Sequence, residues 1–115
     1  MIEDAATHRD LVRAQKAGVT IAGVCTGVMV LSAAGLTRGR PCTTHHMVKS
    51  ELAAQGDTVV DARVVDDGNL VTAGGVTSGI DLALWPVTRE CGPDLALAVE
   101  RIMEYERRGT VWHAV

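Results

Sequence analysis

One cysteine, Cys25, stands where a run of apolar, β-forming residues gives way to residues that favour a helix. It lies within AGVTIAGVCTGVMVLSAAGL, residues 17–36. In an open α/β sheet this junction is the carboxyl end of a strand, where ligands bind. The free N–H groups at the helix start would favour a thiolate and hold a developing oxyanion, and Gly27 permits a tight turn. The pattern predicts a nucleophile elbow, and the alternative interpretation is a buried core cysteine.

The elements around Cys25 alternate between strand and helix. We expect Val19–Val24 to be an internal strand, and the Asp67-Gly68 step predicts a hairpin of 62–65 with 70–73. A helix should follow Thr77 or Ser78 as its N-cap and be kinked or shortened at Pro86. The other expected elements are helices at 3–17, 26–35, 47–55 and 94–107 and a short strand at 41–44. This alternation predicts an α/β fold with a mainly parallel sheet.

Length, charge and cysteine content limit the classes of function that this protein could have. The 115 residues suit one domain, and a net charge of −3 without a basic stripe argues against nucleic acid. The longest apolar stretch is broken by Gly, Thr and Ser, so the sequence predicts neither a membrane span nor a signal peptide. The three cysteines form no CxxC pair and leave an odd count, which is typical of the reducing cytoplasm.

A few other polar residues are candidates for chemistry. His45 and His46 could belong to a site or simply to a polar loop end, and their spacing from other ligand types predicts no metal site. Asp81 and Glu90 could be general bases, but we interpret them as charges on a helix surface. The sequence predicts no cofactor.

Two separated motifs carry a resemblance to a known family. GVCTGVMVLSAAGLTRGRPCTTHH, followed by RVVDDGNLVTAGGVTSGIDLAL, is similar to the ThiJ/PfpI superfamily, the class I glutamine amidotransferase-like group. The threonine after the cysteine, TTH and DGNLVTAGG look most like its isonitrile hydratase branch. The resemblance implies a flavodoxin-like three-layer sandwich that is incomplete at its N-terminus. Residues 1–115 would form a single domain, corresponding to the C-terminal portion of the family domain.

The resemblance also implies an activity and the residues that perform it. It implies a cysteine-dependent enzyme that adds water to an isonitrile to give an N-formamide. The alternatives are a glyoxalase- or deglycase-like activity on small aldehydes, a redox-sensing stress protein, and an inactive fragment. The implied catalytic residues are Cys25, Thr26 and His45, and the implied substrate and oxyanion pocket comprises Gly23, Gly27, Gly75 and Thr77.

The N-terminal part is where the sequence departs from the family. The acid that family members place against the nucleophile has no counterpart that we can identify in these residues. The sheet would also expose an apolar edge, so we expect a homodimer or a complementing fragment to cover it. The expected ligand is a small molecule in the cytoplasm, with no nucleic acid or membrane partner.

Overall fold

Strand β1 (Ile21–Val24) leads directly to Cys25 and pairs in parallel with β5 (Leu70–Ala73). In the computed structural model, which describes residues 4–114, the main sheet has the order β1-β5-β4-β6. β4 (Val64–Asp66) pairs antiparallel with β5 and parallel with β6 (Trp112–His113). The predicted hairpin is confirmed, with Val64 opposite Ala73. The order also places β1 at an edge of the sheet, so the prediction of an internal strand is wrong for this chain.

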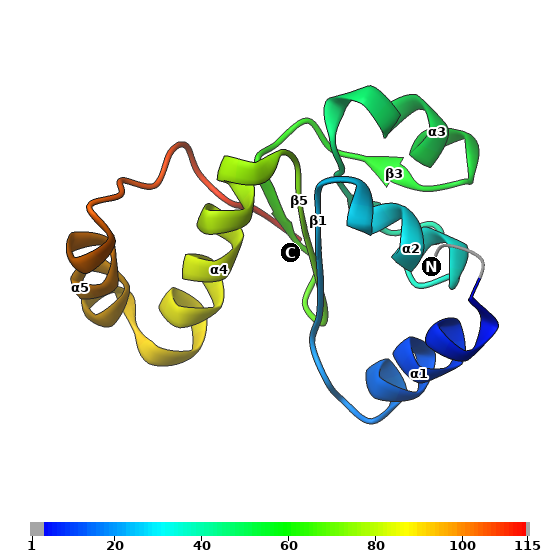
Figure 1. Cartoon of the computed structure of the whole chain (residues 1–115), viewed down its shortest axis with the longest axis horizontal. Helices are drawn as coiled ribbons and strands as arrows, with labels where there is room; N and C mark the ends of the chain where they lie inside the picture. The colour runs from blue at the N-terminus through cyan, green and yellow to red at the C-terminus, as the bar shows by residue number, and fades with distance from the viewer. Residues whose placement is uncertain (1–3, 115) are drawn as a thin grey trace.

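Helices cover both faces of this sheet, as Figure 1 shows. α1 (Ala5–Lys16) and α2 (Val28–Ala33) lie on one face, and α4 (Val76–Cys91) lies on the other. α5 (Pro93–Met103) packs on the outside of α4. The result is the predicted flavodoxin-like layering of helix, sheet and helix. No helix within residues 4–114 combines the length and the apolar character needed to cross a bilayer.

A smaller unit stands beside the main sheet, above α2 in Figure 1. It consists of α3 (Lys49–Ala54) and the parallel pair β2 (Pro41–Cys42) and β3 (Thr58–Val59). Its apolar residues share one cluster with the first turns of α2: Val28, Met29, Cys42 and Leu52. This packing holds the segment after β2 close to the residues that follow β1.

The two faces of the main sheet have separate apolar cores. On the α1 and α2 side, Ile21, Leu31, Leu36 and Leu70 form one cluster. On the α4 side, Val64, Val71 and Ala73 form another, with Leu82 and Trp85 packed against it. Alternate residues of β5 therefore serve opposite faces, which is the period-two pattern of a strand buried on both sides.

Helix α4 runs without interruption through Pro86, so the predicted shortening is wrong. Side chains on both sides of the proline are anchored to one buried carboxylate. Trp85 Nε1 donates to Asp66 Oδ2 at 2.5 Å, and Arg89 Nη1 donates to the same oxygen at 3.0 Å. These bonds hold both halves of the helix on the sheet and offset the hydrogen bond that proline cannot make.

The ends of α4 and α5 also differ from the predictions. Gly75 is the N-cap of α4, so Thr77 and Ser78 lie inside its first turn rather than capping it. α5 ends at Met103 because Glu104 adopts a left-handed backbone, with φ of 51°. The Glu100 carboxylate then accepts from the backbone N–H of Arg107 at 2.8 Å, which fixes the chain outside the helix.

Candidate functional site

Cys25 has a backbone conformation that few non-glycine residues adopt. Its φ is +59°, and it begins a single 3-10 turn, η1 (Cys25–Gly27), between β1 and α2. A left-handed backbone costs an L-residue about 1–2 kcal/mol, so the surrounding structure must impose it. The Cys25 side chain is half-buried at the carboxyl end of the strand. These features are those of a nucleophile elbow.

The elbow is held in place by the segment that follows β2. Thr44 Oγ1 donates to the Cys25 carbonyl oxygen at 2.7 Å. The preceding residue is tied to the sheet, because Thr43 N donates to Thr72 Oγ1 at 2.9 Å. Both threonines are fully buried. The TTH motif thus positions the backbone of the elbow, a role that the sequence alone did not reveal.

Glycine permits close packing around β1 at two positions. A Cβ at Gly23 would lie 2.7 Å from Leu31 Cδ1, and a Cβ at Gly79 would lie 2.9 Å from Val24 Cγ2. Gly23 therefore lets α2 approach the strand, while Gly79 lets the start of α4 approach the last residue before Cys25. A Cβ at Gly27 would meet nothing within 4 Å, so Gly27 borders open space beside the elbow.

The predicted histidine, His45, lies directly after the threonine that bonds to Cys25. Its Nδ1 accepts from Met47 N at 3.2 Å, so His45 caps the short turn η2 (His46–Val48). In the neutral ring this bond leaves the proton on Nε2. The His45 and His46 rings pack with centroids 4.4 Å apart. His46 is exposed, and no group of three potential metal ligands occurs in residues 4–114.

The remaining predicted residues lie around the same end of the sheet. Thr26 follows Cys25 and is exposed. Gly75 starts α4 and lines a cavity beside Thr44. Thr77 instead faces a polar cluster, where its hydroxyl accepts from Arg63 Nη2 at 3.3 Å and its carbonyl accepts from the Tyr105 hydroxyl at 3.2 Å.

Asp81 is buried, so its interpretation as a surface charge is wrong. Arg63 Nε donates to its Oδ2 at 2.8 Å, and the Tyr105 hydroxyl donates to its Oδ1 at 2.9 Å. The hydrogen bond with Asp81 raises the pKa of Arg63. Burial, and then the bond to Asp81, raise the pKa of Tyr105. Asp81 thus joins α4 to two distant segments, which no local pattern indicates.

The other two cysteines have different settings. Cys42 is fully buried in β2, and burial, with the nearby Asp57 carboxylate, raises the pKa of its thiol to about 12. Cys91 is exposed at the C-terminal end of α4. All three cysteines are free. The Cys42 thiol is therefore unreactive. The exposed Cys91 thiol can serve as the comparison for Cys25 in experiments on cysteine variants.

Known proteins are similar to this chain in sequence. Residues 3–88 match the DJ-1/PfpI family model. The chain is 43% identical over 106 residues to isonitrile hydratase from Pseudomonas putida, which covers 91% of this chain and 46% of that protein. It is 39% identical over 56 residues to a deglycase from Pyrococcus horikoshii, covering 49% of this chain and 34% of the deglycase.

A solved structure gives the same result for the fold. A ThiJ/PfpI family protein from Pseudomonas syringae superposes with a TM-score of 0.79 at 33% identity, covering 94% of this chain and 45% of that one. The chain thus spans less than half the length of each of these three proteins.

Proposed function

Because this chain belongs to the DJ-1/PfpI family, we propose that it is a cysteine-dependent enzyme that hydrates a small isonitrile, with Cys25 as the nucleophile. The observation that carries the proposal is the left-handed backbone of Cys25 between strand and helix. Strain of this kind is found where a fold must present a reactive side chain. The identity to isonitrile hydratase favours the substrate class.

The reaction would proceed through a covalent intermediate. The Cys25 thiolate bonds to the terminal carbon of R–N≡C, and that carbon takes a proton, which gives the thioimidate R–N=CH–S–Cys25. Water adds to the same carbon, the nitrogen takes a proton, and the water oxygen gives one up. The resulting hydroxyl gives up its remaining proton as the C–S bond breaks, releasing R–NH–CHO and the thiolate.

The other residues would support this chemistry. His45 is the proposed proton donor, because its Nδ1 is engaged and its Nε2 carries the proton of the neutral ring. Thr26 and Gly27 would line the approach to the sulfur, with Gly75 at the N-cap of α4. Thr77 would act from the neighbouring polar cluster, where Arg63 and Tyr105 bind it. Gly23 would act through packing, by allowing α2 to lie close behind the elbow.

The test is formation of N-formamide from a simple isonitrile, followed by NMR. Cys25→Ser should abolish turnover, while the matched substitution Cys91→Ser, at an exposed thiol, should leave it unchanged. Unchanged turnover in Cys25→Ser would refute the role of the sulfur. An inactive wild-type chain would refute the assignment of isonitriles as the substrate.

The second candidate is a deglycase-like reaction on a small aldehyde, which the 39% identity to the Pyrococcus deglycase favours. The same pair of cysteine variants, assayed for consumption of glyoxal, distinguishes the two. Consumption of glyoxal without hydration of the isonitrile would replace the first candidate by the second.

We also propose that the open edge of β1 is covered in the working protein, by a second copy or by a complementing fragment. Ala22 and Val24 are exposed along this edge strand, which pairs with β5 alone. A cytoplasmic location is part of the proposal, because free thiols persist in a reducing compartment. A stable, well-folded monomer by sedimentation at micromolar concentration would refute the coverage of β1.

A further inference from the structure

A cavity of about 290 Å³ lies next to Thr44, and its walls are partly polar and partly apolar. It is formed where the segment after β2, the loop before β4 and the start of α4 meet. Thr44 lines it and also donates to the Cys25 carbonyl oxygen, so the cavity and the elbow share one residue. Its lining residues are Thr44, His46, Lys49, Asp61, Ala62, Arg63, Gly74, Gly75 and Ser78.

The N-terminus of α4 opens into this cavity. Gly74, Gly75 and Ser78 line it, and the N-cap Gly75 supplies no side-chain hydrogen bond. The first bond along the helix runs from Gly79 N to Gly75 O, so the preceding N–H groups have no acceptor within the helix. A helix of 16 residues directs partial positive charge to these groups. This end of the cavity therefore favours an anion.

Ser78 provides an independent indication of a ligand. Ser78 lines the cavity and is only 4% exposed. Within residues 4–114 its hydroxyl makes no hydrogen bond to another protein group, and Oγ is not one of the fully enclosed polar atoms, so it is accessible from the cavity. A hydroxyl that lacks a protein partner at the wall of a cavity is free to donate to a ligand. An oxygen acceptor in the cavity would satisfy it together with the helix N–H groups.

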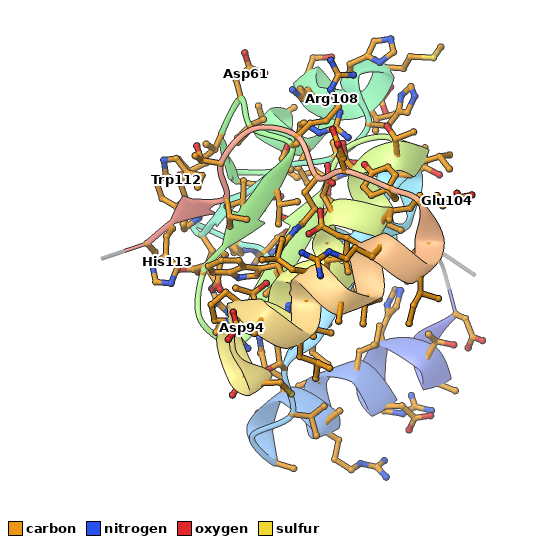
Figure 2. The ribbon with its side chains drawn as sticks, turned by 90° about the vertical axis from the view of Figure 1, so that its left-hand side faces the viewer. Asp61, Asp94, Glu104, Arg108, Trp112 and His113 are labelled. Atoms are coloured by element: carbon orange, nitrogen blue, oxygen red, sulfur yellow. The ribbon has the colours of Figure 1, made fainter. Side chains whose placement is uncertain are left out.

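The charged groups in the lining favour the same kind of ligand. Lys49 and Arg63 are cations, but Arg63 is already paired with Asp81, so Lys49 is the cation available to a ligand. Asp61 is the one carboxylate among the lining residues. Lys49 Nζ lies 3.0 Å from Asp61 Oδ1, but the Asp61 side chain is fully exposed and points away from the ribbon in Figure 2. An exposed pair of this kind contributes little, so Lys49 can exchange it for an anion in the cavity.

We propose that this cavity binds an oxyanion, a carboxylate or a phosphate, and that the substrate of Cys25 carries such a group. The link to the substrate rests on the proposed function, whereas the anion site itself does not. With the anionic group held by Ser78 and the start of α4, the electrophilic carbon would reach the sulfur past Thr44. The substrate class would then be small electrophiles that bear a carboxylate or a phosphate.

Binding is tested with inorganic phosphate and with acetate, each titrated separately against ¹⁵N-labelled protein. We expect saturable shifts of the amides at the start of α4, and the tighter of the two ions identifies the group. Ser78→Ala should weaken binding by about tenfold or more, since hydrogen bonds to charged acceptors are strong. Lys49→Gln should also weaken it. The matched controls are Ser50→Ala and Lys16→Gln, at exposed helix positions, and should not.

Two results would overturn the anion site. One is the absence of saturable binding of either ion to the wild-type chain. The other is an affinity for the ion that is the same in Ser78→Ala and Lys49→Gln as in their control variants. Neither result depends on turnover, so the site stands or falls separately from the enzyme.

The link to the substrate is tested with a pair of isonitriles, isocyanoacetate and its neutral methyl ester. We expect kcat/KM to be higher for the anion, and Ser78→Ala to lower kcat/KM for the anion alone. Equal rates for both compounds, unchanged in Ser78→Ala, would overturn the link even if the ions bind. Failure to hydrate either compound would refute the isonitrile function and the substrate link, and leave the ion titration to decide the site.

Discussion

Replacing Cys25 by glycine should give a more stable protein than replacing it by alanine. The left-handed backbone at this residue, with φ of +59°, costs any L-residue about 1–2 kcal/mol. Glycine avoids that cost but loses about 0.5–1 kcal/mol through the greater freedom of its unfolded chain. The difference favours Cys25→Gly over Cys25→Ala by about 0.5–1 kcal/mol. Neither variant has a sulfur, so the comparison isolates the backbone.

The neighbouring residue provides the control. Thr26 lies in the same 3-10 turn, and among the described non-glycine residues only Cys25 and Glu104 have a positive φ. Thr26→Gly should therefore be less stable than Thr26→Ala by about 1 kcal/mol. Urea midpoints at a common m-value measure both differences. If the glycine variant were less stable than the alanine variant at both positions, the backbone of Cys25 would not be strained. The argument for the elbow would then lose its basis.

Other substitutions test the packing and the charges. Gly23→Ala should lower the free energy of unfolding in urea by about 1–3 kcal/mol, because its Cβ would overlap Leu31. Gly27→Ala should lower it much less, and equal losses would contradict the packing role of Gly23. Glu104→Gly should raise the thermal midpoint of unfolding, since Glu104 ends α5 in a left-handed conformation, and a lower midpoint would contradict this. Burial acts to raise the pKa of Asp66, but the donors Trp85, Gly68 and Arg89 outweigh it and lower the pKa. The stability that Asp66 contributes is therefore full above the ordinary aspartate pKa of about 4 and is lost as the pH falls through the lowered value. Asp66→Asn should destabilise the protein at pH 7 and less so in acid, while the control Asp61→Asn, at an exposed carboxylate, should change little at either pH. A pH-independent loss in Asp66→Asn would contradict the role of its charge.

The parts of the fold set by local patterns could be predicted from the sequence. The Asp67-Gly68 step identified the hairpin, and the change from apolar β-forming residues to small helical ones located the elbow at Cys25. The predictions that failed depend on contacts between distant segments. Asp81 is buried because Arg63 and Tyr105 reach it, and α4 passes Pro86 because Asp66 anchors both sides.

The candidate site shows the same division. Cys25, His45 and Gly75 carry recognisable motifs, and the structure places them at one end of the sheet. Thr44 and Ser78 gain their roles only from the fold. Thr44 donates to the Cys25 carbonyl oxygen, and Ser78 faces a cavity that three separate segments enclose. β6 consists of two residues, which is too short for any periodic pattern to reveal.

The pairing of β1 with β5 has a consequence for the order of folding. The β4–β5 hairpin closes over a few residues, and hairpins of this kind form in about 1–10 μs. β1 can join β5 only after the chain has looped through α2, α3 and β4, because Ile21 pairs with Leu70. Distant pairings of this kind form slowly. The left-handed turn at Cys25 follows β1 directly, so a newly made chain lacks this backbone conformation until β1 has joined the sheet. The reactivity proposed for this sulfur would thus be acquired at the end of folding.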